Sequence, residues 1–375
     1  MATDDNGSCQ IPVEILGQHV APFLDRVTLN HLSLANTKIQ EVILHSGIHL
    51  PWPETSFLVR WYTCCLSFSP DGNILVCGDR EGVITMWDRI HGHRISFRPP
   101  QTSHSQIFLA FSPDGRWLAS GSEDSIYLWD PSDHDYFRRL TRDRDGDINC
   151  VAFSPDGQTI AAGVGDYGYI KLWNVEDGTC TMTLEGLDED EVGMYDARMR
   201  WSSLAFSPDG RSLASAGGRF AMLLLWDLSD GSYKTFSNGH GQNPKTDLSS
   251  FVAFSSDGCL VSSDNEYIRF RKVFDCDSAE VDHNEAIIRS IEMRCNTNTE
   301  TEENSSVNVK ILSLSFSGDE SVVASGHADN LVRLWNTEDG SPIVGTYPGS
   351  VVAFAPDQRI LAALDSDRLV RIHAY

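Results

Sequence analysis

The chain has 375 residues, of which 41% are hydrophobic and 22% are charged, as expected for a soluble globular protein with one large domain and a small accessory segment. Its formal net charge of -24 argues against a nucleic-acid partner, because nucleic-acid affinity rests on Lys and Arg side chains that neutralise phosphates. No apolar run is long enough to span a bilayer and no leader-like segment opens the chain, so no membrane partner is expected.

Two or three short amphipathic helices are predicted between residues 11 and 50, after a disordered tail at residues 1–10. Pro12 suits a first helical turn, where its missing N–H costs nothing. Apolar residues then recur close to helical spacing, from Ile15 and Leu16 to Phe23. These helices are too small to bury a core alone, so they need a partner or the rest of the chain.

This segment resembles an F-box, the helical module that docks onto a Skp-type adaptor in cullin-based (SCF-type) ubiquitin ligases. Three departures are Ile11 in place of Leu, one extra residue before Phe23, and Ile39 where Trp is common. The alternative is a helical cap that packs on the rest of the chain. The resemblance implies that the adaptor contacts are Ile11, Pro12, Glu14, Ile15, Leu16, Phe23, Leu24, Leu29, Leu32 and Leu34.

A short turn recurs along the remaining chain at a period near forty residues. Ser-Pro-Asp-Gly follows Phe68, Phe111, Phe153 and Phe206, and eroded copies follow Phe254, Phe316 and Phe354. The order Ser, Pro, Asp, Gly suits a type I turn. Seven copies at this period predict one supersecondary unit built seven times.

Each unit reads as four short antiparallel strands, the third of which usually ends in Trp-Asp or Trp-Asn. The unit is similar to the WD repeat, whose seven copies typically form a seven-bladed β-propeller. The expected fold is therefore an all-β seven-bladed propeller over residues 56–375, preceded by the α-helical F-box-like segment. The fifth and seventh units lack Trp-Asp, and the family's bracing loop Asp matches only at Asp329, with Ser325 and Trp335, and at Asp367.

The seventh unit ends at Tyr375 after its third strand. A closed propeller leaves no unpaired strand edge, and open edges invite aggregation. We therefore expect the segment from Ser56 to Arg60 to supply the fourth strand and close the ring.

Nine cysteines are scattered along the chain without a C-x-x-C pair, which predicts reduced thiols and a location in the cytosol or the nucleus. The adjacent Cys64 and Cys65 are expected to point to opposite faces of a strand. Polar insertions at 185–191 and 296–306 are expected to be solvated loops, with regulation by phosphorylation at Thr301 or Ser305 as the alternative.

No catalytic signature such as H-E-x-x-H, a Walker loop or G-x-S-x-G is present, so the chain is not expected to be an enzyme or to hold a cofactor or metal. His91-Gly92-His93 reads as a polar turn. Partners are expected instead on the face formed by the loops between the second and third strands, called b–c loops here.

Acidic residues outnumber arginines in these loops, whereas receptors for phosphorylated peptides resemble one another in clustering arginines there. The expected ligand is therefore a basic or non-phosphorylated protein segment. The predicted contacts are Arg80, Glu81, Glu123, Tyr167, Arg219, Phe220, Glu266 and His327.

The favoured function is a substrate-recognition subunit of a cullin-type ubiquitin ligase, with residues 11–50 docking the adaptor and the propeller holding the substrate. Such a subunit performs no chemistry and acts by raising the effective concentration of its substrate near a conjugating enzyme. The alternative is a general WD-repeat scaffold whose N-terminal helices only cap the ring.

Overall fold

A computed structural model describes residues 2–3, 9–10, 56–59, 63–90, 92–100, 106–133, 136–142, 146–166, 168–185, 200–217, 222–236, 251–263, 267–272, 287–292, 310–356 and 359–374. The chain divides into two compact units, Met1–Thr55 with Trp87–Arg94 and Ser56–Met86 with Ile95–Tyr375. In the first, β1 (Ala2–Thr3) pairs antiparallel with β2 (Cys9–Gln10). The helices predicted for residues 11–50 lie outside the described residues.

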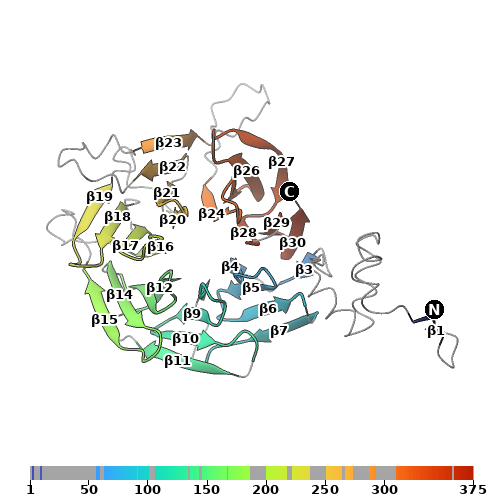
Figure 1. The fold of residues 1–375 in the computed structure, drawn as a ribbon, viewed down its shortest axis with the longest axis horizontal. Coiled ribbons are helices and arrows are strands. Elements are labelled where there is room, and N and C mark those ends of the chain that lie inside the picture. The colour runs from blue at the N-terminus through green and yellow to red at the C-terminus, as the bar shows by residue number, and fades with distance from the viewer. Residues whose placement is uncertain are drawn as a thin grey trace. The chain divides into compact units, whose positions relative to one another are not determined.

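Strands β3 to β30 form seven four-stranded sheets among the described residues, each a blade of a β-propeller (Figure 1). Blade 1 contains β4 (Thr63–Phe68), β5 (Ile74–Asp79), β6 (Ile84–Asp88) and β7 (His93–Phe97). Blade 2 contains β8 (Phe108–Phe111), β9 (Leu118–Ser122), β10 (Ser125–Trp129) and β11 (Phe137–Arg142). Blade 3 contains β12 (Ile148–Phe153), β13 (Thr159–Val164), β14 (Tyr169–Asn174) and β15 (Cys180–Leu184).

The later blades repeat the same order. Blade 4 contains β16 (Trp201–Phe206), β17 (Ser212–Gly217), β18 (Met222–Asp227) and β19 (Tyr233–Phe236). Blade 5 contains β20 (Phe251–Phe254), β21 (Cys259–Ser263), β22 (Tyr267–Lys272) and β23 (Ile287–Glu292). Blade 6 contains β24 (Ile311–Phe316), β25 (Val322–His327), β26 (Leu331–Asn336) and β27 (Pro342–Pro348). Blade 7 contains β28 (Val351–Phe354), β29 (Ile360–Leu364), β30 (Leu369–Ala374) and β3 (Ser56–Leu58).

Strand β3 closes the ring, which confirms the prediction made from the sequence. It pairs antiparallel with β30, with Phe57 opposite Val370, and the Val59 N–H continues the ladder by donating to the Arg368 carbonyl at 2.8 Å. Phe57 is buried whereas its neighbour Leu58 points outward. An N-terminal strand thereby completes the C-terminal sheet and removes its open edge.

The recurring turn is held by hydrogen bonds between its own residues, as blade 2 illustrates. The Ser112 hydroxyl donates to Asp114 Oδ1 at 2.6 Å and accepts the Trp117 N–H at 2.9 Å, while the Gly115 N–H donates to the Ser112 carbonyl at 2.9 Å. Gly115 has a φ of 72°, a conformation that glycine adopts at no steric cost. Ser154 and Ser207 make the same set of bonds in blades 3 and 4.

The hydrophobic clusters of the described residues lie between neighbouring blades, so the ring is held together by inter-sheet packing. Cys150 and Ile170 of blade 3 pack with Trp201 and Trp226 of blade 4, for example. The blades approach so closely that a Cβ on Gly121 would lie 2.5 Å from Ile148 of the next blade. Burial of these large apolar side chains is the main favourable contribution to stability.

The two adjacent cysteines do not point to opposite faces, which corrects the prediction. A register shift between Thr63 and Cys65 interrupts the alternation of β4. Cys64 Sγ lies 3.5 Å from the Gly78 carbonyl oxygen, and Cys65 Sγ lies 3.4 Å from that of Ile107 and 3.8 Å from that of Gly78. Both thiols therefore face the same pair of carbonyl groups. Among the described residues, Cys64, Cys65, Cys77, Cys150, Cys180 and Cys259 form no disulfide.

Candidate partner-binding faces

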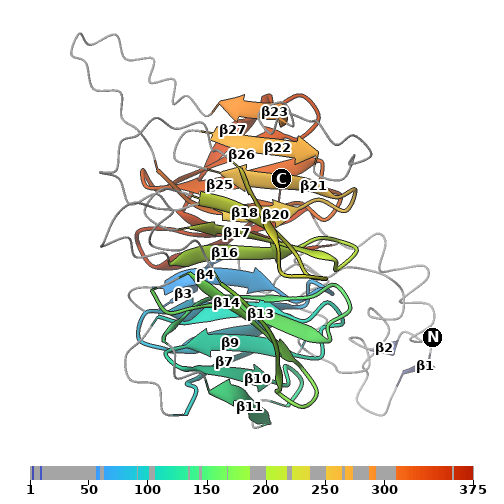
Figure 2. The same ribbon diagram turned by 90° about the vertical axis from the view of Figure 1, so that its left-hand side faces the viewer.

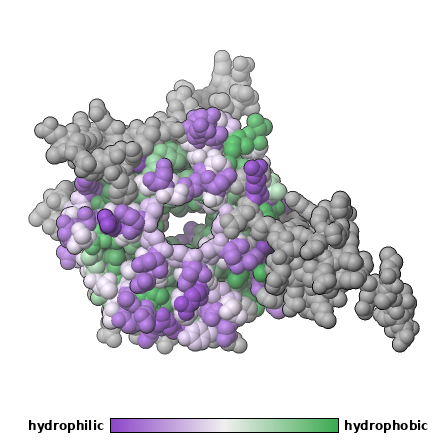
Figure 3. Space-filling model, viewed as in Figure 1, coloured by the Kyte–Doolittle hydropathy of each residue, from purple (hydrophilic) through white to green (hydrophobic). Residues whose placement is uncertain are grey.

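The antiparallel order of each blade gives the propeller two loop-bearing faces. Loops between the second and third strands lie at one end of the blades, here the b–c face. The turns between the first and second strands and the loops between the third and fourth strands both lie at the other end. This end is called the a–b face here. The side view of Figure 2 shows the strands along their length, with loops at both ends. In the view onto one face, hydrophilic side chains surround a central opening (Figure 3).

Two of the acidic residues in the b–c loops are buried supports of their own loops. Asp79 is 2% exposed, and its Oδ1 accepts the N–H groups of Glu81 and Val83 at 2.9 and 2.8 Å. Asp365 is 6% exposed, accepts the N–H groups of Asp367 and Leu369 at 2.9 Å, and pairs with Arg371 at 2.8 Å. Asp365, and not Asp367 as predicted, is therefore the bracing residue of blade 7.

Two further carboxylates of this face form ion pairs with nearby arginines. Asp166 of blade 3 forms an ion pair with Arg200, and Asp329 of blade 6 forms one with Arg333 at 2.6 Å. Burial disfavours the charged form of Asp329, but the hydrogen bonds and charge of Arg333 outweigh it and lower the pKa of the carboxyl. The b–c face is thus less acidic than a count of its residues suggests.

His327 was predicted to contact a partner, but only 1% of it is exposed. Its Nε2 lies 2.8 Å from the Ser325 hydroxyl, which also accepts the Trp335 Nε1–H at 2.8 Å. This trio belongs to the interior of blade 6. The residue that braces Ser325 is therefore His327, and not Asp329 as predicted.

Equivalent Trp–Ser bonds join strands in blades 2 and 4. Trp129 donates to Ser120 at 2.7 Å and Trp226 donates to Ser215 at 2.9 Å. In blade 5 the buried Arg271 occupies the Trp position, opposite Leu260, and donates to the Ser262 hydroxyl. The bond that holds the third strand therefore survives where the Trp-Asp signature does not.

Of the predicted b–c contacts, the structure places Arg80, Glu81 and Glu123 at the ends of blades 1 and 2. Arg80 is exposed, Glu81 and Glu123 are half-buried, and Glu123 has a φ of 48° at the tip of its turn. Predicted contacts outside the described residues are Tyr167, Arg219, Phe220 and Glu266. So are the predicted adaptor contacts Ile11, Pro12, Glu14, Ile15, Leu16, Phe23, Leu24, Leu29, Leu32 and Leu34.

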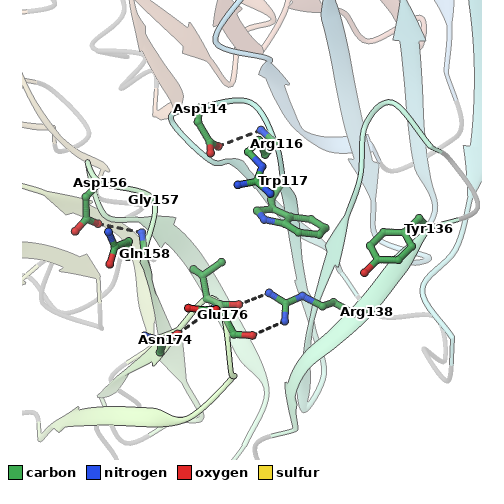
Figure 4. Close-up of a pocket in the computed structure, with 11 residues that line it drawn as sticks. Asp114, Arg116, Trp117, Tyr136, Arg138, Asp156, Gly157, Gln158, Asn174 and Glu176 are labelled. Carbon is green, nitrogen blue, oxygen red and sulfur yellow. Dashed lines mark hydrogen bonds between the residues drawn. The ribbon is translucent and has the colours of Figure 1, made fainter.

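A groove of about 640 Å³, which no sequence motif predicted, lies on the a–b face between blades 2 and 3. Arg138 of β11 crosses it: Nη1 donates to the Glu176 carbonyl at 2.7 Å, Nη2 donates to the Val175 carbonyl, and Cζ lies 5.3 Å from the centre of the Trp117 ring system. Figure 4 shows Arg138 pointing toward Glu176, with the rings of Trp117 and Tyr136 beside it. The ring centres of Trp117 and Tyr136 are 6.1 Å apart.

Neither face contains a recognisable metal centre among the residues described, since no group of three His, Cys, Asp or Glu side chains there is arranged to hold a metal ion. In the same part of the chain, no helix is long and apolar enough to cross a membrane.

Comparison with known proteins identifies the repeats. The WD40 family model, described as WD domain, G-beta repeat, matches residues 60–88, 97–130, 137–174 and 301–336. The chain carries WD40 repeats. Its seven four-stranded sheets form a seven-bladed β-propeller of the kind that WD40 repeats build.

The curated relatives are partial matches. Telomerase Cajal body protein 1 of Homo sapiens is 31% identical over 200 residues, or 50% of this chain and 34% of that protein. Small ribosomal subunit protein RACK1z of Oryza sativa subsp. japonica is 37% identical over 70 residues, or 18% of this chain and 20% of that protein. The chain thus spans about a third of the first relative and a fifth of the second.

A solved structure supports the fold. The crystal structure of the Myceliophteria thermophila Cps50 (Swd1) β-propeller domain matches with a TM-score of 0.66, covering 85% of this chain and 98% of that one. Its sequence is 17% identical, so the likeness concerns the fold alone.

Proposed function

We propose that the chain is a non-catalytic protein-interaction subunit whose b–c face holds a protein or peptide partner. The observation that carries this is the closed ring of seven hydrogen-bonded sheets, with loops that differ from blade to blade at one end. Binding residues concentrate on loops that a rigid scaffold positions. No cofactor is proposed, and the expected location remains the cytosol or nucleus.

The finer proposal concerns residues 11–50, which resemble an F-box. If this segment docks a Skp-type adaptor, the chain is a substrate-recognition subunit of a cullin-based ubiquitin ligase. The support is the sequence pattern of Ile11-Pro12, Glu14-Ile15-Leu16 and Phe23-Leu24, followed in the chain by a complete propeller. Tethering substrate beside a conjugating enzyme raises its effective concentration without chemistry by this chain.

The second candidate is a general WD-repeat scaffold whose N-terminal segment only covers part of the ring. It is favoured by the curated relatives, because the names of Telomerase Cajal body protein 1 and of the RACK1 small ribosomal subunit proteins refer to other assemblies and to no ubiquitin ligase. The two candidates differ in one measurable property, the binding of an adaptor.

Affinity purification of the tagged full-length chain from cells that co-express a Skp-type adaptor and a cullin separates the two. The ligase proposal predicts that both co-purify with the wild type and neither with Leu16→Asp/Phe23→Asp. Glu123→Gln on the b–c face is the matched control and is expected to retain both. Failure of the wild type to retain the adaptor would leave the general scaffold as the function.

The ligand of the b–c face is proposed to be a basic or non-phosphorylated segment, with Arg80, Glu81 and Glu123 among its contacts. Because several carboxylates of this face are buried or ion-paired, we expect the contribution of charge to be modest. Once a partner is known, its affinity should be unchanged by phosphatase treatment and should fall about two- to fivefold in Glu81→Gln/Glu123→Gln. A requirement for partner phosphorylation would contradict this assignment.

A further inference from the structure

The residues that line the groove on the a–b face can be compared with the equivalent residues of the other blades. In each blade the same backbone bond marks the residue that follows the turn, as when the Ser112 N–H donates to the Trp117 carbonyl at 2.8 Å. The residues in this position in the other six blades are Ile74, Thr159, Ser212, Cys259, Val322 and Ile360. The fold therefore does not require a Trp here, and blade 2 alone among these carries one.

Tyr136 departs from the repeat in the same way. Its carbonyl accepts the Asp130 N–H at 3.1 Å, and the residues that make the corresponding bond in blades 3, 4 and 6 are Thr179, Ser232 and Ser341. Half of Tyr136 is exposed, which is unusual for so large a side chain. Trp117 and Tyr136 thus stand where the other blades carry smaller side chains. The centres of their rings are 6.1 Å apart. Clustered Trp and Tyr side chains are the residues most enriched at the energetic centres of protein interfaces.

Carboxylates surround these rings. Asp114 and Asp156 are exposed, and the hydroxyls of Ser112 and Ser154 donate to them and lower the pKa of each carboxyl, so both are ionised at neutral pH. In each, only Oδ1 accepts hydrogen bonds from described residues. The exposed carboxylate of Glu176 makes no hydrogen bond or ion pair with a described residue.

The positive charges of the groove only partly offset these carboxylates. The two Nη atoms of Arg138 donate to the carbonyls of Glu176 and Val175, and its guanidinium lies over the Trp117 ring. This side chain therefore links blade 2 to blade 3. Arg116 is the remaining cation of the lining. The chain as a whole carries a charge of -24, which adds to the attraction for a basic ligand.

We propose that this groove is a second docking site, for a basic peptide segment of a partner protein. The alkyl part of a Lys or Arg side chain packs against Trp117 and Tyr136, and its cation meets Glu176 and the outer oxygens of Asp114 and Asp156. The site is at the opposite end of the blades from the b–c face, so one propeller can hold two partners. This inference does not depend on whether residues 11–50 bind an adaptor.

The test measures fluorescence anisotropy of a labelled peptide of alternating Ala and Arg with the full-length chain at physiological ionic strength. The key variant is Trp117→Thr/Tyr136→Thr, which installs the residues that blade 3 carries at the same positions and leaves the net charge unchanged. It should weaken binding about tenfold or more. Glu176→Gln should weaken it about two- to fivefold.

Glu338→Gln, at the exposed position of blade 6 that corresponds to Glu176, is the matched control for loss of negative charge and should leave the peptide affinity unchanged. Tyr136→Thr alone, at an exposed position, keeps the test valid if the double variant melts early. Equal affinity of the wild type and the Thr variants would overturn the proposal, because binding would then be general attraction to an acidic protein. Tighter binding of an Ala-Glu peptide would overturn it as well.

Discussion

At the residue scale, single hydroxyl groups hold the strands and turns of this propeller. Ser325 accepts a bond from Trp335 and meets His327 inside blade 6, while Ser317 donates to the carboxylate of Asp319 in the neighbouring turn. Such groups matter because a buried donor that loses its partner pays its full desolvation cost. The repeat thus depends on small polar residues as much as on its tryptophans.

Replacement of Ser325 by Ala should therefore destabilise the propeller by about 1–3 kcal/mol, because it leaves the buried Trp335 Nε1–H without its acceptor and removes the bond between Ser325 and His327. Ser341→Ala is the matched control at an exposed position of the same blade and should change stability by less than about 0.5 kcal/mol. Urea unfolding of both variants measures the difference. Equal stabilities would contradict the role assigned to Ser325.

The turn aspartates predict a loss of stability in acid. Hydrogen bonds from the Ser317 and Ser321 hydroxyls lower the pKa of Asp319 from 3.8 to about 2. Because the folded-state pKa lies below the unfolded one, ionised Asp319 stabilises the fold above pH 3.8, and this contribution disappears as the pH falls toward 2. The difference in unfolding free energy between wild type and Asp319→Asn should shrink over that interval. A difference that stays constant from neutral pH to pH 2 would contradict this account.

At the element scale, β3 is the strand on which closure depends. It joins the first described residues of the second unit to β30 near the C-terminus, and without it blade 7 exposes an edge. Alternation along this strand separates two roles, since Phe57 faces the interior and Leu58 faces outward.

Phe57→Ala should accordingly lower the free energy of unfolding by about 3–5 kcal/mol, the usual cost of removing a buried aromatic side chain. Leu58→Ala, next to it and 52% exposed, should change it by less than about 0.5 kcal/mol. Thermal melts followed by circular dichroism compare the two. Similar melting temperatures for both variants would show that β3 does not hold the ring closed.

The sequence predicts the elements of this fold better than the environment of individual side chains. The Ser-Pro-Asp-Gly turn sets the register, and the missing fourth strand of the seventh unit points to β3, because both follow from local pattern and from the need to pair every edge. Whether a loop carboxylate is free depends on contacts that local pattern does not specify. Asp79 and Asp365 accept hydrogen bonds from their own loops, so a count of loop carboxylates overstates the acidity of the b–c face.

Other errors have the same physical origin. The register shift in β4 turned Cys64 to the side of Cys65, and the burial of His327 removed it from the predicted surface. The groove could not be predicted from the sequence either, because Trp117 and Tyr136 belong to different loops of blade 2 and come together only in the folded sheet. One signal was present: these positions depart from the residue types of the other repeats.

At the scale of the whole molecule, the WD-repeat propeller offers two loop-bearing faces of different character. On the b–c face several carboxylates form ion pairs or hydrogen bonds within the protein. The a–b face instead carries an aromatic groove between exposed carboxylates. A propeller with two such faces suits the binding of more than one partner. We propose that residues 11–50 add a third contact, with a Skp-type adaptor.

Calorimetric titration of a purified Skp-type adaptor into the purified full-length chain tests this claim most directly. The account predicts one-to-one binding by the wild type, weakened about a hundredfold or more in Leu16→Asp/Phe23→Asp, with the melting temperature of the propeller unchanged. No detectable binding by the wild type, or equal binding by the double variant, would contradict it.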